Sequence, residues 1–276
     1  MHPELFEIFG LKIRSFGLMA AIGLLLAFWL MRKRCAKAGE DPEKLSDVLF
    51  FSMIGGLIGA RLLYVIRNYE NEFSKDFWKI FKIHEGGIVF QGGFIGALIV
   101  AWFLCKKKNV DFVRSLDIIA PCLALGHAMG RIGCHLNGCC WGGLCKTGWG
   151  VKFPPNSLPY THQMSAGQIP PMAPHSLPVH PTQLYSFAAN IVICLILVFV
   201  TAKMKAKGHL FSLYLMIYGV WRMSVEFLRD DQSRHLGLSV AQYIALGQFA
   251  LGLGLWIYFS KKSKTSEVAD SEPAAN

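Results

Sequence analysis

The sequence predicts an all-α integral membrane protein with about seven transmembrane helices and a proline-rich loop between the fourth and the fifth. Of its 276 residues, 53% are hydrophobic and 17% are charged, whereas soluble domains have about 25% charged residues. Apolar stretches close to the ~20 residues that cross a hydrocarbon core recur along the chain. The one long interruption is dense in proline, which a continuous helix does not tolerate.

Seven apolar segments carry this prediction. They are expected at residues 16–26, 46–66, 86–104, 112–133, 182–202, 208–228 and 238–259. The first and the fourth depart most from a continuous apolar run. We expect residues 1–262 to form one polytopic membrane domain. The small, polar segment 263–276 is expected to be a disordered cytoplasmic tail, because it offers no apolar periodicity to bury.

Lysine and arginine gather in alternate loops, at residues 32–44, 106–114, 203–207 and 261–264. Such residues favour the cytoplasmic side of a membrane, so we expect the N-terminus outside and the C-terminus inside. The net charge of +10 then reflects topology and contact with anionic membrane lipids, and no nucleic-acid partner is expected. Glu4, Glu7 and a basic cluster that follows the first apolar run argue against a cleaved signal peptide.

The interruption at residues 143–181 holds eight of the twelve prolines, including Pro154-Pro155 and Pro170-Pro171. This density of proline excludes a continuous helix or a central strand and predicts an irregular cap that lies on the non-cytoplasmic side of the membrane. Long irregular loops in compact proteins are often functional, and we expect this one to cover a site as a lid.

Two similar glycine motifs, "GGLIGA" at 55–60 and "GGFIGA" at 92–97, each repeat glycine at a spacing of four. That spacing lets two helices approach closely in lipid, which is the main interpretation. The alternative is that the glycines leave space for a bulky apolar ligand, since each motif lies next to a polar residue, Arg61 or Gln91.

Three arginines fall within or at the end of apolar segments: Arg61, Arg131 and Arg222. Charged residues at such depth are functional by default. Glu226 lies one helical turn after Arg222, so the two could simply form an ion pair. A group of guanidinium ions in a lipid-facing cavity is suited to a phosphodiester, and phospholipid head groups are the abundant candidates. The motif "HPTQLY" at 180–185 adds a helix start whose free N–H groups favour an anion.

Five motifs together resemble the prolipoprotein diacylglyceryl transferase family. They are "GARLLYV" (59–65), "GGIVFQGGFIG" (86–96), "GRIGCHLNGCCWG" (130–142), "HPTQLY" (180–185) and "YGVWRMSVEFLRDD" (218–231), in this order over nearly the whole chain. The resemblance implies an enzyme of the bacterial inner membrane with a periplasmic N-terminus. It would transfer the diacylglyceryl group of phosphatidylglycerol to the lipobox cysteine of a prolipoprotein signal peptide and release glycerol phosphate. No cofactor is implied.

The resemblance also assigns roles. The catalytic residues would be Arg131, Arg222 and Glu226, to which we add His127 as the base. The resemblance also places signature residues at Asn137 and Gly142. We expect the substrate-binding residues to be Arg61, Gln91, Gly92, Gly93, Asn137, Gly142, His180, Gln183 and Tyr185. Four positions depart from the family pattern, namely Phe16 for a tyrosine, Gln91 for a histidine, Cys134 for an asparagine and Cys139 for a glutamate.

The identity of the general base stays open, because a glutamine cannot accept a proton at neutral pH. The nucleophile would be the acceptor thiol, with an ordinary pKa of ~8.5 that nearby positive charge lowers. The candidate bases are Glu226, His84, His127 and His135. His127 is preferred because it lies one turn before Arg131, although a lone histidine on a helix is more often structural.

Four cysteines lie within twelve residues, at Cys134, Cys139, Cys140 and Cys145. Disulfides, free thiols that fill space, and a metal site are the alternatives, and the metal site is the weakest because no C-x₂-C pair is present. Two other functions stay open. One is an anion or lipid transporter lined by the arginines, and the other is a catalytically altered relative that binds phospholipid or metal through the cysteine-rich loop.

Overall fold

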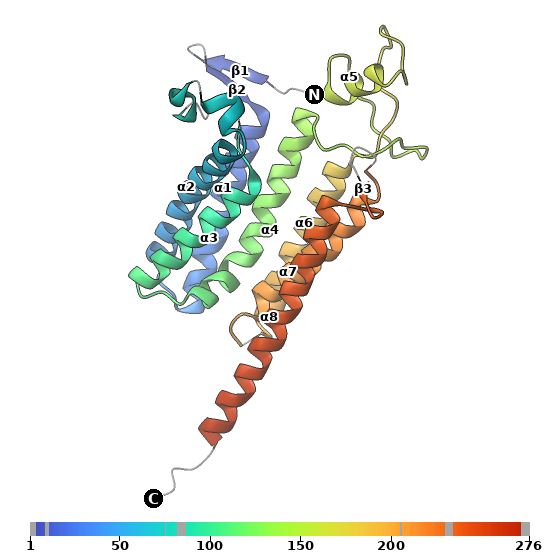
Figure 1. Ribbon diagram of the computed structural model, residues 1–276. Helices are drawn as coiled ribbons and strands as arrows, with labels where there is room; N and C mark the ends of the chain where they lie inside the picture. Colours follow the sequence, from blue (N-terminus) through green and yellow to red (C-terminus); the bar gives the residue numbers. More distant parts are fainter. Residues whose placement is uncertain are drawn as a thin grey trace, which may run out of the picture. The chain divides into compact units, whose positions relative to one another are not determined.

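The computed structural model describes residues 4–8, 11–74, 76–81, 87–204, 206–229 and 234–271, and its fold is helical (Figure 1). The long helices are α1 (Ser15–Ala38), α2 (Pro42–Arg67), α3 (Phe90–Lys107), α4 (Phe112–Asn137), α6 (Thr182–Thr201), α7 (His209–Glu226) and α8 (Val240–Ser271). Each coincides with one of the seven predicted apolar segments. The prediction of an all-α membrane protein is therefore confirmed.

Five of these helices are long and apolar enough to cross a membrane: α1, α2, α4, α6 and the Val240–Ser263 part of α8. Their apolar surface would be unfavourable in water, and a bilayer is the solvent that suits it. The remaining two, α3 and α7, have 18 residues each. The count of seven spans stays a prediction.

The smaller elements were not predicted by periodicity. They are a hairpin of β1 (Glu4–Ile8) and β2 (Leu11–Arg14), the single turns η1 (Tyr69–Phe73) and η2 (Phe77–Phe81), the short helix α5 (Leu158–Ser165), and a hairpin of β3 (Arg234–His235) and β4 (Leu238–Ser239). Strands of two to five residues are too short to show a clear alternating pattern. None of them alters the helical class of the fold.

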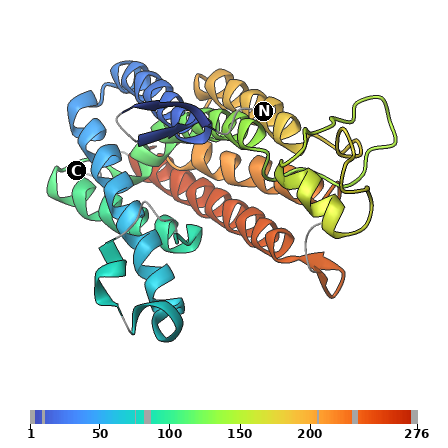
Figure 2. The same cartoon turned by 90° about the horizontal axis from the view of Figure 1, so that it is seen from above.

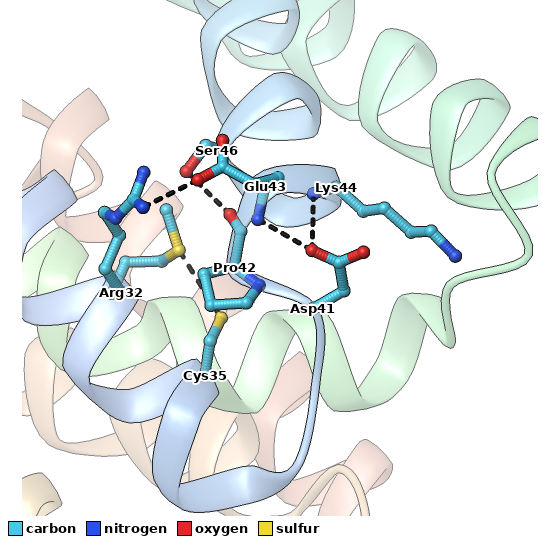
Figure 3. Close-up of polar contacts among 8 residues, drawn as sticks. Arg32, Cys35, Asp41, Pro42, Glu43, Lys44 and Ser46 are labelled. Atoms are coloured by element: carbon cyan, nitrogen blue, oxygen red, sulfur yellow. Dashed lines mark hydrogen bonds and ion pairs between the residues drawn. The ribbon is translucent and has the colours of Figure 1, made fainter.

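The described chain divides into two compact units, one of residues 1–30 and 117–276 and the other of residues 31–116. The single membrane domain predicted for residues 1–262 stays a prediction. In the 31–116 unit, the connection from α1 to α2 is fixed by polar contacts (Figure 3). Asp41 caps α2 by accepting from the amides of Glu43 and Lys44 at 2.9 and 3.3 Å, as an aspartate at this position commonly does.

Helices α2 and α3 pack at very short range in the same unit. A Cβ atom added to Gly59 would lie 2.4 Å from the carbonyl oxygen of Gly92, and one added to Gly92 would lie 2.3 Å from that of Gly59. Only glycine allows this approach, in which one backbone lies directly against the other. The interpretation of the two glycine motifs as packing motifs is confirmed, and the predicted substrate-binding role of Gly92 and Gly93 is not needed to explain them.

In the other unit, α4, α6 and α7 share a buried apolar core. Its members are Ala120, Ala124, Ile193, Cys194, Leu197, Leu210, Tyr214 and Leu215. Helices α6, α7 and α8 run side by side in both views (Figures 1 and 2). Asp117 of α4 accepts from the amides of Gly208 and Phe211 at 2.6 and 2.8 Å, and so caps the start of α7 from a neighbouring helix.

The proline-rich segment 143–181 is irregular apart from α5, which carries Pro159 in its first turn, where proline is tolerated. Tyr160 donates to the carbonyl of Pro171 at 2.9 Å, and Gln163 pairs with the backbone of Leu177. The segment is therefore held by its own side chains. Its role as a lid stays a prediction.

At the C-terminal end, α8 extends to Ser271 and so enters the segment 263–276 that we expect to be a tail. Residues 272–276 lie outside the described residues, and the tail stays a prediction.

Candidate active site

One face of α7 carries a row of polar side chains at intervals of four residues: Tyr214, Tyr218, Arg222 and Glu226. A spacing of four places side chains one above another on a helix. Tyr214 and Glu226 are buried, with exposed fractions of 4% and 2%. The row forms one wall of the candidate site.

The facing wall comes from α4, through His127 and Arg131. The hydroxyl of Tyr214 lies 3.1 Å from Nδ1 of His127, and the imidazole lies against the Tyr218 ring with centroids 5.3 Å apart. Arg131, one turn further along α4, lies beside Tyr218 and interacts electrostatically with His127. Tyr214 and Tyr218 of α7 thus contact His127 of α4, and Tyr218 also contacts Arg131.

Arg222 is held by an ion pair. Its guanidinium donates to Glu226 at 2.5 Å, and the hydroxyl of Ser239 donates to the other oxygen of the same carboxylate at 2.8 Å. The Arg222 side chain is 20% exposed and that of Glu226 is 2% exposed. Because both carboxylate oxygens are engaged and buried, Glu226 is arranged to position Arg222 rather than to take a proton from a substrate.

The chain between α4 and α6 returns to this wall at the start of α6. Gly142 donates its amide to the carbonyl of His180 at 2.9 Å, and a Cβ atom on Gly142 would lie 2.6 Å from the carbonyl oxygen of Leu228. His180 lies 3.5 Å from the hydroxyl of Tyr185. Gly142, His180 and Tyr185 thus lie at one place, next to the end of α7, and their substrate-binding roles stay a prediction.

The first residues of α6 bind the backbone after α4. Thr182 donates to the carbonyl of Cys140 at 2.7 Å, and Gln183 donates to that of Cys139 at 2.8 Å. Both side chains are buried. The "HPTQLY" motif therefore acts here by fixing the cysteine-containing turn. Binding of substrate by Gln183 stays a prediction.

Three of the four cysteines form a group at this turn. The sulfurs of Cys134, Cys139 and Cys140 all lie within 4.8 Å of one another, and these three residues carry free thiols. The structure has no disulfide among these three cysteines, and the assignment of the group stays a prediction. Cys145 is apart from the group, and its thiol lies 3.1 Å from the hydroxyl of Thr147.

The electrostatic surroundings favour a charged sulfur in this group. Hydrogen bonds from the thiols of Cys134 and Cys139, followed by the positive charges of Arg229 and Arg131, lower the pKa of Cys140 below its ordinary value. Asn137 lies beside the Cys139 thiol. A thiolate here would be stabilised by two guanidinium groups.

Similarity to known proteins identifies the family of this chain. A family model described as prolipoprotein diacylglyceryl transferase matches residues 3–258. The chain belongs to this family. Relatives named phosphatidylglycerol–prolipoprotein diacylglyceryl transferase include one from Clostridium tetani, 38% identical with 94% of this chain and 97% of the relative covered. One from Pseudoalteromonas atlantica is 33% identical, with 97% and 92% covered.

A third relative, from Clostridium perfringens, is 37% identical and covers 96% of this chain and 97% of its own length. This relative is named phosphatidylglycerol–prolipoprotein diacylglyceryl transferase 2. The match to the family model includes residues of both units. The resemblance drawn from the five sequence motifs is confirmed.

Within the family framework, the predicted catalytic residues His127, Arg131, Arg222 and Glu226 all belong to one unit and to two facing helices. Of the other bases considered, His135 lies against Phe153 with centroids 6.2 Å apart, and its Nδ1 is buried without a hydrogen-bond partner in the described part of the chain. His84 lies outside the described residues. The geometry favours His127 among these candidates.

Arg61 has a different environment from the one predicted. Its guanidinium donates to the carbonyls of Ile80 and Gly87, each at 2.9 Å, and to that of Lys79. The group also lies over the rings of Tyr64 and Phe73. These contacts favour a structural role for Arg61, which ties the loop after α2 to that helix, over the predicted contact with substrate. Gln91 is exposed near the start of α3.

Sequence reasoning missed Tyr214, Tyr218 and Ser239. The two tyrosines carry a detectable signal, because they continue the interval of four from Arg222 and Glu226 back along the same face. Ser239 carries none, since it reaches Glu226 from β4, thirteen residues away.

Proposed function

We propose that this protein transfers the diacylglyceryl group of phosphatidylglycerol to the cysteine thiol of a prolipoprotein signal peptide, the first step of bacterial lipoprotein maturation. The location would be the inner membrane, with a periplasmic N-terminus and a cytoplasmic C-terminus. Family membership supports the reaction. The observation that carries the proposal is the wall of α4 and α7, on which Arg131 and the buried Arg222–Glu226 pair lie together with His127.

The chemistry follows from the charges. The thiolate sulfur attacks the glyceryl carbon bonded to the phosphate oxygen, the new S–C bond forms, and the C–O bond breaks with its electron pair going to that oxygen. Negative charge therefore grows on the departing glycerol phosphate. Fixed guanidinium donors stabilise charge that develops in a site poor in water. We assign this role to Arg131 and Arg222.

His127 is the group proposed to take the thiol proton. Its Nδ1 is engaged by Tyr214. If the hydroxyl accepts from Nδ1–H, then Nε2 is unprotonated and able to accept a proton. Tyr214 would in that way select the tautomer that makes His127 a base. Glu226 is proposed as a positioning residue for Arg222, in place of a direct catalytic role.

The test uses the purified full chain in phosphatidylglycerol vesicles with a lipobox peptide. We expect a thioether-linked product in the wild type, and a decrease of about 10²–10³-fold in kcat for Arg131→Ala, the size seen when one oxyanion-stabilising donor is removed. Arg131→Lys keeps the charge but loses the planar fork, and should restore only part of the rate. Arg67→Ala, at an exposed arginine at the end of α2, is the matched control.

Absence of thioether product in the wild type, with folded protein, would overturn the proposal. Equal rates for wild type and Arg131→Ala would remove the assigned role of the arginine. Movement of a phosphate-bearing solute across sealed vesicles without product would favour the transporter alternative.

A further inference from the structure

The proposed transfer needs a deprotonated acceptor thiol, and the group formed by Cys134, Cys139 and Cys140 offers a way to supply one. We propose that these three residues form a zinc-binding site of three thiolates, whose fourth coordination position receives the acceptor thiol of the signal peptide. The second half of this inference rests on the proposed function. The first half, binding of a thiophilic divalent ion, does not.

The geometry suits a single ion. With Zn–S bonds of about 2.3 Å, three sulfurs on one zinc ion lie about 4 Å apart, and the three sulfurs here already lie within 4.8 Å of one another. Closure therefore requires shifts within the reach of side-chain rotation. Soft thiolate ligands select zinc or Cu(I) over harder ions such as Mg²⁺.

The backbone around the three sulfurs is held by hydrogen bonds from the start of α6. Cys134 lies in the last turn of α4, and the chain then reverses through Gly138 and Cys140, whose φ angles are +74° and +61°. A positive φ is strained for a residue with a side chain. The turn is held in this conformation by Thr182 and Gln183 through the carbonyls of Cys140 and Cys139.

This turn explains why the sequence spacing argued against a metal site. A C-x₄-C-C pattern lacks the C-x₂-C knuckle because the helix end and the reversal at Gly138 take its place. The fourth cysteine is not required, since three protein ligands and one open position are the arrangement of catalytic zinc sites. All three cysteines are half-buried, so the group is partly accessible.

The charges nearby also suit this ion. Three thiolates and a divalent cation carry a net charge of −1, and Arg131 and Arg229 lie close enough to interact with Cys140. Arg131 is the arginine proposed to stabilise the leaving phosphate. The cysteine group therefore lies near one of the groups assigned to stabilise the leaving phosphate.

An incoming thiol loses its proton on coordination, and His127, the base of the proposed function, takes that proton. The coordinated sulfur then forms the S–C bond as the C–O bond breaks, with the electron pair leaving on the phosphate oxygen. The thioether that results is a weaker ligand than a thiolate and dissociates. Zinc keeps its oxidation state throughout. A base at position 91, where this chain has Gln91, would then be unnecessary.

The binding test is independent of turnover. The full chain in detergent is reduced, stripped with a chelator and titrated with Zn²⁺, and with Co²⁺ as a spectroscopic probe. We expect one equivalent bound and sulfur-to-cobalt charge-transfer bands, both lost in Cys139→Ser. Cys145→Ser makes the same substitution at a thiol outside the group and should bind as the wild type does. Thermal unfolding of both variants excludes a folding defect.

The second test adds lipobox peptides to the Co²⁺-loaded protein. A peptide with cysteine should change the charge-transfer bands, and its serine analogue should not. Failure to bind metal, or a disulfide within the group in protein isolated without reductant, would overturn the whole inference. Metal bound with no spectral response to the cysteine peptide would overturn the role of the fourth position. A spectral response without thioether product would instead contradict the proposed function and leave the metal site standing.

Discussion

Replacement of Glu226 by glutamine tests whether the carboxylate positions Arg222. The shapes are nearly equal, so the change removes one charge from a contact of 2.5 Å. At an effective dielectric constant of 20, that contact corresponds to about 7 kcal/mol of attraction before desolvation is counted. Removing one partner of a buried pair costs ~3–5 kcal/mol in practice. Since the Arg222 side chain is 20% exposed, water can recover part of this, and we expect about 3 kcal/mol.

Two measurements separate stability from catalysis. Thermal unfolding in nanodiscs should show the lost stability, and turnover of phosphatidylglycerol with a lipobox peptide should decrease by about 10²-fold because Arg222 is no longer held in place. Ser239→Ala is the graded control. It removes a hydrogen bond to the same carboxylate, at about 1.5–3 kcal/mol, but leaves the ion pair, so the rate should decrease less than about tenfold. Wild-type stability and turnover in Glu226→Gln would refute the positioning role.

Three further predictions concern packing, the loop after α2 and the histidine. Gly59→Ala places a Cβ atom 2.4 Å from a backbone oxygen of α3 and should lower the free energy of unfolding by about 1–3 kcal/mol. Gly254→Ala, with open space around the residue, should be neutral. Equal midpoints of thermal unfolding for the two variants would contradict the packing argument. Arg61→Met leaves three carbonyls unpaired and should lower the unfolding midpoint without changing KM for phosphatidylglycerol, and a raised KM in a stable variant would restore the substrate-binding role. Tyr214→Phe removes the contact to Nδ1 of His127 and should lower kcat by about tenfold at neutral pH; an unchanged kcat would mean that the tautomer is not selected there.

The helices of this protein could be predicted from the sequence because their signal is local. Each apolar segment needs only its own residues to indicate a membrane span. The ion pair of Arg222 and Glu226 could be predicted for the same reason, because both residues lie on one helix. The glycine motifs predicted close packing correctly, because a spacing of four is meaningful within each helix separately.

Contacts between distant segments could not be predicted in the same way. The acceptors of Arg61 lie eighteen or more residues away in an irregular loop, and nothing in the spacing of that loop identifies them. The spacing of Cys134, Cys139 and Cys140 did not predict that their sulfurs lie together, because their approach depends on a left-handed turn at Gly138 and Cys140. The contacts of that turn with Thr182 and Gln183 span more than forty residues.

The cap that Asp117 provides fixes the register of α4 against α7, and so the positions of the charged groups along these two helices. Asp117 joins the beginning of α4 to the beginning of α7, so the two helices rise from a common baseline. At 1.5 Å per residue, Arg131 lies about 21 Å along α4 from Asp117, and Arg222 lies about 17 Å along α7 from Phe211. A slip of one helix by a single turn would break both amide contacts of the Asp117 carboxylate. The register between Arg131 and Arg222 is therefore set by a contact that lies far from both guanidinium groups.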